Sequence, residues 1–205
     1  YVYAFSQLKN TEDVVISVPS GNFGNLTAGI IAMKMGLPVN KFIASTNVNK
    51  IVPEYLKSGE FSPSSSVQTI SNAMDVGNPS NFERIIDLFN HSFDKIKDTI
   101  IGFYFTDDET RSAMQQMYSK FNYIVDPHGA VGYFGLMNYL NIHPEKKGIC
   151  LGTAHPAKFL NVVRPTLNID VKVPNRLQSF MKMKKKSVQI SNVYGDFVNQ
   201  IFEQN

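Results

Sequence analysis

Residues 14–45 constrain the fold more than any other part of the sequence. VVISV, residues 14–18, is short, β-branched and followed by Pro19, as expected for a buried strand. Residues 26–35 have a helical pattern, and KFIAS, residues 41–45, is the next apolar strand. A strand, a helix and a strand within about thirty residues form a βαβ unit, which requires a parallel sheet with a right-handed crossover.

The rest of the chain continues this alternation. The further strands are predicted at 100–105, 123–126 and 148–152. Helices are predicted in the first eight residues, after Asn78 and Pro79 as one apolar helix that includes positions 82–96, and after a Thr106–Glu109 capping box. Three more helices are predicted after Pro127, at 154–163 and at 192–202. Residues 46–81 and 170–187 have the polarity of loops. We therefore expect an α/β fold, with an open, mostly parallel sheet and helices on both faces.

Composition narrows the class of protein. The 205 residues are 43% hydrophobic and 18% charged, with a net charge of +3, as in a soluble globular protein. The one dense basic run, Lys182 with Lys184 to Lys186, is too short to indicate a nucleic-acid partner, and we expect it to be solvated. No apolar segment approaches the roughly 20 residues of a membrane span. We expect no nucleic-acid partner, no membrane and no metal site.

Cys150 is the only cysteine, so an internal disulfide is impossible. This usage favours a reducing compartment, and we expect a cytoplasmic location. The thiol lies in the apolar run KKGICLGT with no adjacent charge that would lower its pKa. We therefore expect a buried structural thiol, and not a nucleophile.

The loop SGNFGN, residues 20–25, joins the first strand to the first helix of the βαβ unit. Backbone N–H groups at a helix N-terminus have no partner within the helix, and the helix dipole there favours negative charge. Glycine lets such a backbone approach a ligand without an intervening side chain. The loop therefore has the chemistry of a phosphate cradle, at the sheet edge where open α/β folds bind ligands.

Known phosphate-binding fingerprints do not match this loop. Gly21 and Gly24 give G-x-x-G, which is neither the dinucleotide motif nor, without a following Lys-Ser or Lys-Thr, a P-loop. The second strand ends in Ser45, Thr46 and Asn47, with no acidic residue for a ribose. From the residues alone, a phosphate site and a merely tight βα turn both remain open.

Five segments in the same order resemble the threonine synthases, pyridoxal-phosphate enzymes of fold type II (the tryptophan synthase β class). The segments are SVPSGNFGNLTAG, KFIASTNVN, SNAMDVGNPSNFERI, DPHGAVGYFGL and LGTAHPAKF. SNAMDVGNPSN and LGTAHPAKF carry most of the specificity. The resemblance covers residues 14 to about 160 and fades beyond about residue 165.

The resemblance implies that the parent enzyme converts O-phosphohomoserine and water to threonine and phosphate, with pyridoxal phosphate as cofactor. It implies that backbone amides of the glycine loop hold the cofactor phosphate, through Gly21, Asn22, Phe23, Gly24 and Asn25. Thr153 matches the residue whose hydroxyl faces the pyridine nitrogen. A neutral hydroxyl is a weaker proton source than a carboxylic acid, so that nitrogen is expected to stay unprotonated.

Asn72 and Asp75, in the SNAMD stretch, are candidate substrate contacts on the same basis, although Asn and Asp in such loops often only satisfy their own backbone. His91, His128, His143 and His155 are expected to be structural, although His155 lies close to Thr153 in the sequence.

One feature of the family is missing. Threonine synthases carry the cofactor as an imine on a lysine in a Ser-Phe-Lys-Asp segment before the glycine loop, whereas here only Lys9 precedes the loop, in QLKN. Lys158 is expected to face solvent or a carboxylate. We therefore expect the C-terminal part of a larger enzyme, with a cofactor-binding core at 1–165 and a tail with a final helix at 166–205.

We therefore expect the isolated chain to lack a catalytic lysine and not to turn over substrate. The sequence does not indicate an oligomeric state. Two alternatives remain: another fold-type-II lyase, and a non-catalytic module that binds a phosphate-bearing ligand.

Overall fold

The chain folds into two compact units in the computed structural model, which describes residues 1–202. The first unit is Tyr1–Val171 and contains the sheet, and the second is Lys172–Asn205.

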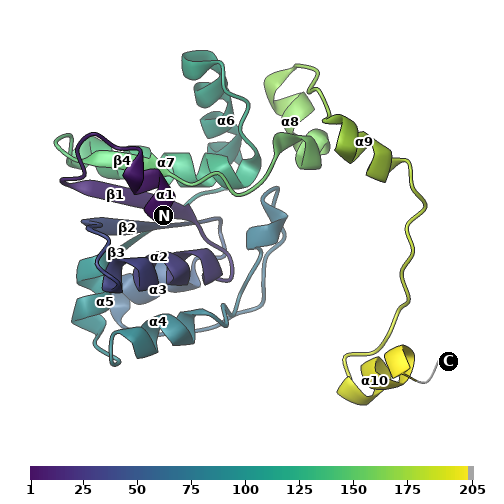
Figure 1. Ribbon diagram of the computed structural model, residues 1–205, viewed down its shortest axis with the longest axis horizontal. Coiled ribbons are helices and arrows are strands. Elements are labelled where there is room, and N and C mark those ends of the chain that lie inside the picture. The colour runs from purple at the N-terminus through teal and green to yellow at the C-terminus, as the bar shows by residue number, and fades with distance from the viewer. Residues whose placement is uncertain (203–205) are drawn as a thin grey trace. The chain divides into compact units, whose positions relative to one another are not determined.

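A four-stranded sheet forms the centre of the first unit. Its strands are β1 (Val14–Pro19), β2 (Lys41–Thr46), β3 (Ile100–Tyr104) and β4 (Lys147–Cys150). The spatial order is β3-β2-β1-β4, and every neighbouring pair is parallel. The predicted α/β fold with a parallel sheet is thus confirmed, and the βαβ unit at its start joins β1 to β2 through α2 (Figure 1).

Helices surround this sheet. In chain order they are α1 (Val2–Ser6), α2 (Gly24–Lys34), α3 (Ile51–Ser58), α4 (Phe82–Leu88), α5 (Phe93–Thr99), α6 (Asp107–Phe121), α7 (Pro127–Ile142) and α8 (Leu160–Leu167). Two short 3₁₀ turns, η1 (Asn72–Met74) and η2 (Pro156–Phe159), complete the first unit.

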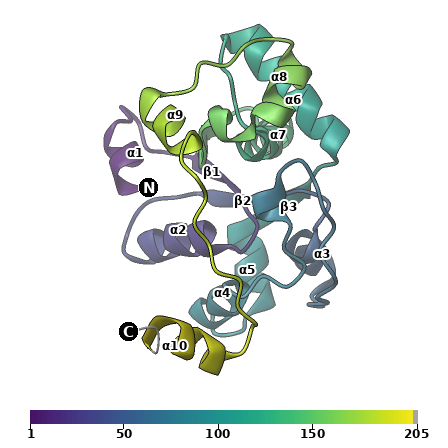
Figure 2. The same cartoon turned by 90° about the vertical axis from the view of Figure 1, so that its right-hand side faces the viewer.

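The two faces of the sheet bury different helices (Figures 1 and 2). Val14, Ile16 and Val18 of β1 pack with residues of α2, α3, α4 and α5 on one face. Val15, which points the other way because side chains alternate along a strand, packs with Leu136 of α7. A further cluster joins α6, α7 and α8. Each fully buried aliphatic side chain of these clusters contributes about 1.5–3 kcal/mol by leaving water.

Three glycines, Gly129, Gly132 and Gly135, recur at helical spacing along α7, and the last two lie directly against the sheet, where a Cβ added at Gly132 would be 2.8 Å from Pro19 Cγ. A Cβ added at Gly135 would lie 1.9 Å from Ser45 Oγ. The buried Ser17 hydroxyl donates to the carbonyl of Gly132 at 2.7 Å, so the Ser45 hydroxyl must donate to Ser17 across 3.0 Å. These contacts fix the N-terminal half of α7 against β1 and β2.

The strand order creates a switch point. From β1 the chain proceeds to β2 and β3 on one side, and β4 is then added on the other side of β1. The segment after β1 leads into α2 on one face, whereas the segment after β4 leads into η2 and α8, which pack with α6 and α7. Ligands in open α/β sheets bind outside the carboxyl ends of such a strand pair.

Several predicted boundaries were wrong. Residues 46–81 are not one loop, because α3 forms within them: Pro53 lies in its first turn, where the missing N–H is tolerated, and half of its residues are buried. The predicted single helix over 82–96 is two helices. Asn90 and His91 both adopt positive φ and end the first of them, and the Ser92 side chain caps α5. The first begins at Phe82, with Asn81 as N-cap, later than Asn78 and Pro79 indicated.

Other segments also differ from the predictions. Residues 123–126 form no strand and instead lead into the N-cap of α7 at Asp126. The last strand ends at Cys150, before 152, and the helix expected at 154–163 is divided into η2 and α8. The Thr106–Glu109 capping box of α6 is confirmed, and α2 begins at Gly24, two residues earlier than its apolar pattern indicated.

The second unit contains α9 (Asn175–Met181) and α10 (Tyr194–Phe202). The last helix was predicted correctly, whereas α9 lies in a segment that we expected to be a loop. Neither helix has a buried residue. Within residues 1–202, no helix has both the length and the apolar character needed to cross a membrane.

Candidate active site

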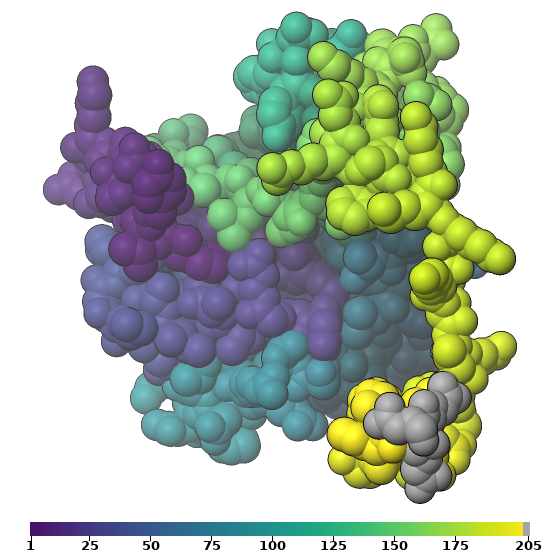
Figure 3. Space-filling model, turned by 45° about the vertical axis from the view of Figure 1, so that its right-hand side comes forward, coloured from purple at the N-terminus to yellow at the C-terminus, as the bar shows by residue number. Residues whose placement is uncertain are grey.

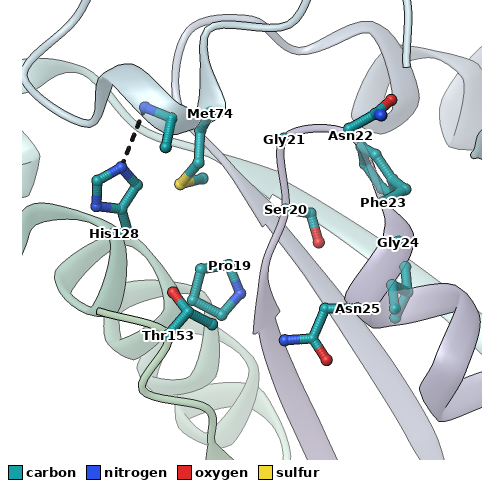
Figure 4. A pocket seen from close by; sticks show the side chains of 12 residues that line it. Pro19, Ser20, Gly21, Asn22, Phe23, Gly24, Asn25, Met74, His128 and Thr153 are labelled. Carbon is teal, nitrogen blue, oxygen red and sulfur yellow. Dashed lines mark hydrogen bonds between the residues drawn. The ribbon is translucent and has the colours of Figure 1, made fainter. Parts of the chain in front are cut away.

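A cavity of about 240 Å³ opens at the switch point, beyond the carboxyl ends of β1 and β4. Four separate segments line it: the end of β1 with the glycine loop, η1, the first turn of α7, and the residue Thr153 after β4. Figure 4 shows the glycine loop on one side of the cavity and Met74 with His128 across from it. The lining residues are Pro19, Ser20, Gly21, Asn22, Phe23, Gly24, Asn25, Leu26, Ala73, Met74, His128 and Thr153.

The glycine loop presents a run of free backbone donors. Phe23 is the N-cap of α2 and has left-handed geometry, with φ of 62° and ψ of 7°. Among the described residues, no acceptor pairs with any backbone N–H from 21 to 26, and the first amide of this helix to be paired is that of Thr27, with the Phe23 carbonyl. Unpaired donors at a helix N-terminus, reinforced by the helix dipole, form a site for an anion.

The left-handed geometry of Phe23 is held by packing. Its ring is buried and contacts Phe82 edge-on, with the ring centroids 5.8 Å apart. A non-glycine residue in this conformation carries backbone strain, which the surrounding structure must offset. The buried ring therefore anchors the loop in the shape that exposes its amides.

Side chains also brace the loop from outside. Asn22 exchanges hydrogen bonds with Ser80, at 3.1 and 3.2 Å. The Tyr1 hydroxyl lies 2.7 Å from the Asn25 carbonyl oxygen and 2.9 Å from its Oδ1. In Figure 3 the N-terminal segment, in dark purple, lies against the violet surface of the residues that follow it in the colour bar. Burial raises the pKa of Tyr1, so its hydroxyl stays a donor at neutral pH.

The neighbouring backbone leaves no space for a Cβ at Gly21. Its φ is not positive, but a Cβ there would lie 2.7 Å from Met74 Cα and 2.8 Å from the Ala73 carbonyl oxygen. Both contacts are with backbone, which cannot rotate away. Gly24 is less constrained, since its added Cβ would be 3.4 Å from the side-chain nitrogen of Asn81. The backbone of η1 thus packs directly on the loop and forms the opposite wall of the cavity.

Thr153 reaches the same cavity from the segment after β4 (Figure 4). The amide of Leu151 donates to the Ser17 carbonyl at 3.0 Å, which ties the start of this segment to β1. The structure therefore brings together all six predicted cofactor-binding residues around one cavity. What they bind stays a prediction at this point.

Asn72 and Asp75 do not line the cavity, although Ala73 and Met74 between them do. Asn72 is exposed. Asp75 Oδ1 accepts from Asn47 Nδ2 at 2.8 Å and from the Thr69 hydroxyl at 2.7 Å, and its Oδ2 accepts from the Thr69 amide at 3.0 Å. This carboxylate holds the two ends of a loop together. A substrate contact for either residue stays a prediction.

The histidines fall into different settings. His155 accepts from the Ala157 amide at 3.1 Å and caps η2, and His143 is the C-cap of α7. His91 lies at the junction of α4 and α5. His128 is buried and lines the cavity, which sequence reasoning missed because nothing in the pattern DPHG shows which way the ring points.

Among residues 1–202 no lysine lines the cavity, and both Lys9 and Lys158 are exposed elsewhere. Cys150 lies behind the site, against α7, with its Sγ 3.9 Å from the Gly129 carbonyl oxygen. Burial, with a smaller effect of the Asp126 charge, raises the pKa of this thiol to about 12. A thiol with so high a pKa is a poor nucleophile at neutral pH.

Comparison with known proteins points to one family. The family model described as "Pyridoxal-phosphate dependent enzyme" matches residues 2–152, and the one described as "Threonine synthase, C-terminal" matches residues 129–201. A protein named threonine synthase from Haemophilus influenzae is 43% identical over 194 residues, which are 94% of this chain and 45% of that protein. The chain thus spans about half the length of the curated relatives it matches.

Solved structures agree. The crystal structure of threonine synthase from Escherichia coli has a TM-score of 0.88 and 36% identity, covering 98% of this chain and 46% of that one. A structure titled as a pyridoxal-phosphate-bound threonine synthase from Brucella melitensis has a TM-score of 0.76 and 29% identity, covering 90% of this chain and 44% of that one. With the family match extending from the first helix through β4 and including the glycine loop, the chain belongs to the pyridoxal-phosphate-dependent enzyme family.

Proposed function

We propose that the cavity binds pyridoxal phosphate, with the phosphate at the backbone amides of residues 21–26 and the pyridine nitrogen toward Thr153. The observation that carries the proposal is the run of amides without a protein acceptor at the start of α2, facing a cavity that a side chain at Gly21 would disturb. A dianionic phosphate satisfies such donors better than water does, because the helix dipole adds to the hydrogen bonds.

Thr153 fits the other end of the cofactor. Its hydroxyl can donate to the pyridine nitrogen and leave that nitrogen unprotonated, since a hydroxyl does not give up its proton near neutral pH. When bound, pyridoxal phosphate withdraws electrons from the carbon that carries the substrate amino group. The described residues of this chain would bind and orient the cofactor for that chemistry. None of those that line the cavity is a lysine or carries a carboxylic acid.

We propose further that this chain is the C-terminal half of a threonine synthase, which converts O-phosphohomoserine and water to threonine and phosphate in the cytoplasm. The relatives that support this are themselves named threonine synthase and are about twice as long. Because no lysine of the described part of the chain lines the cavity, the 205-residue chain alone is expected to bind the cofactor without forming a covalent bond to it, and to be inactive.

The test is a pyridoxal-phosphate titration of the chain followed by borohydride reduction and mass analysis. We expect saturable binding and no reduced cofactor on any residue. Specific trapping on Lys158 or Lys9 would place the catalytic centre elsewhere, and a complete lack of binding would reject the cofactor assignment.

A second assay addresses the reaction. The full-length protein that contains this chain is given O-phosphohomoserine, free threonine or free serine in separate reactions. Release of phosphate with formation of threonine supports the proposal. Deamination of threonine or serine without activity on O-phosphohomoserine would identify a different fold-type-II lyase.

A further inference from the structure

Asp126 and His128, at the start of α7, form a buried pair beside the cavity. Their exposed fractions are 2% and 4%. Asp126 is the N-cap of the helix, and its Oδ1 accepts from the His128 backbone amide at 2.9 Å. The same oxygen lies 2.8 Å from His128 Nδ1. The carboxylate therefore holds both the backbone and the ring of the same histidine.

This contact decides the tautomer of His128. A carboxylate oxygen only accepts hydrogen bonds, so Nδ1 must carry the hydrogen, and in the neutral ring Nε2 is then an acceptor. The amide of Ala73 donates to this Nε2 at 3.2 Å, as the dashed line in Figure 4 shows. Asp126, His128 and Ala73 thus form a chain of hydrogen bonds from α7 to the turn η1.

The turn that is held in this way is the wall of the cavity opposite the glycine loop. Ala73 and Met74 pack on Gly21, where no Cβ would fit. The end of the same turn is tied to the end of β2 through Asp75 and Asn47. The turn is therefore fixed on two sides, by α7 and by β2, and its position sets how close the wall comes to the loop.

The bond from the Ala73 amide joins an exposed residue of η1 to the buried ring of His128. What the bond adds is a fixed direction and distance between α7 and η1. A buried, carboxylate-oriented histidine is a rigid means of holding a backbone amide, because the ring has few rotamers and one of its nitrogens is already bound.

We propose that Asp126 and His128 are a positioning pair, which holds η1 against the glycine loop and so sets the shape of the cavity for a phosphate-bearing ligand. The effect on ligand affinity rests on the proposed function, whereas the hydrogen-bond chain itself does not. In this role the pair acts through the backbone of residues 73 and 74, and removing the Nε2 acceptor widens the distribution of positions of η1.

Two variants of the full 205-residue chain separate the two nitrogens of the ring. In His128→Asn the short amide can replace Nδ1 as the partner of Asp126 but cannot reach Ala73. In His128→Gln the longer side chain places an amide oxygen near the position of Nε2, where it can accept from Ala73. Both variants remove the ring, and they differ in which partner the side-chain amide reaches, Asp126 in His128→Asn and Ala73 in His128→Gln.

The first readout is the amide of Ala73 by NMR. We expect a scalar coupling across the hydrogen bond to His128 Nε2 in the unmodified chain. We expect amide exchange at Ala73 about tenfold faster in His128→Asn, and close to the original rate in His128→Gln. Absence of the coupling, or equal exchange in all three proteins, would overturn the proposal.

The second readout is the affinity for pyridoxal phosphate. His128→Asn is expected to weaken binding roughly five- to tenfold while His128→Gln retains most of it. Equal weakening in both variants would contradict a role through Ala73. If neither the unmodified chain nor the variants bind pyridoxal phosphate, the proposed function fails. The amide exchange and the scalar coupling at Ala73 then still decide whether Asp126 and His128 position η1.

Discussion

Gly21 is the residue at which a single added atom changes the cavity most. Its backbone conformation is ordinary, so its freedom to adopt unusual φ is not the reason for glycine. The reason is the backbone of η1, which occupies the space where a Cβ would project. From the sequence alone, Gly21 and Gly24 of SGNFGN looked equally necessary. The structure shows that an added Cβ has less space at Gly21 than at Gly24.

Gly21→Ala and Gly24→Ala form a matched pair. The first must displace the backbone of Ala73 and Met74, whereas the second meets only a movable Asn81 side chain. We expect Gly21→Ala to weaken pyridoxal-phosphate binding by about tenfold or more and Gly24→Ala to weaken it by less than about threefold. Titration of both variants checks this ranking, and the reverse order would show that the wall does not shape the site.

Cys150 provides a test that does not depend on any ligand. Its pKa is raised from 9.0 to about 12, so the thiolate is scarce in the folded chain. We expect alkylation by iodoacetamide at neutral pH to be on the order of 100- to 1,000-fold slower than for a free cysteine, and to become normal in urea. Rapid modification of the native chain would show an accessible, activated thiol.

The same shift predicts a dependence of stability on pH. Because the folded pKa is the higher one, the thiol's contribution to stability is fully present below pH 9 and is lost as the pH rises through about 12. Burial also raises the pKa of Tyr55 and Tyr133, so these phenols add to the loss of stability at alkaline pH. The comparison of the unmodified chain with Cys150→Ala isolates the thiol, and the variant is expected to lose less stability above pH 9.

At the scale of elements, α7 links the sheet to the cavity. Its glycines allow the helix to lie on β1 and β2, and its N-terminus carries Asp126 and His128 to the cavity. The apolar sequence of this helix has no amphipathic stripe, because most of its sides are buried. Its close packing is therefore a requirement both for the fold and for the position of the site.

Gly135→Ala tests this packing. The added methyl would overlap Ser45 Oγ, and we expect a loss of about 2–3 kcal/mol in the free energy of unfolding. Gly152→Ala is the control, since a Cβ there meets nothing within 4 Å. Urea denaturation of both variants measures the difference. A loss below about 0.5 kcal/mol for Gly135→Ala would mean that α7 is not tightly seated.

The elements that sequence reasoning predicted correctly are those with a strong local signal. The βαβ unit, the capping box at Thr106 and the last helix follow from strand composition, a capping pair and a helical period. The break between α4 and α5 was missed because the apolar stripe continues through it, while Asn90 and His91 turn the chain without interrupting the pattern. Helix α3 was missed because its stripe is short and contains Pro53.

The lining of the cavity was predictable in part, and what it binds stays a prediction. The glycine loop and Thr153 could be identified by family resemblance, and the strand order then brings them together. The wall formed by Ala73 and Met74 could not, since it is made of backbone and depends on contacts between distant segments. The same holds for His128, whose role depends on a tautomer set by Asp126.

At the scale of the whole molecule, the cavity is a consequence of topology. Segments after β1 and β4, about 130 residues apart in sequence, meet because β4 pairs with β1 after the chain has passed through β2 and β3. A helix N-terminus with free amides on one side and a hydroxyl on the other gives the cavity a polarity. This polarity fits a ligand with a phosphate at one end and a ring nitrogen at the other.

The measurement that tests the central claim most directly is an amide NMR titration of the ¹⁵N-labelled chain with pyridoxal phosphate. We expect the amides of residues 21–26 to shift first and together, in the direction of new hydrogen bonds to an anion, and Thr153 to shift with them. Inorganic phosphate should move the loop amides at higher concentration and leave Thr153 in place. Shifts confined to other regions, or no shift in residues 21–26 at saturating cofactor, would show that the loop does not bind the cofactor phosphate.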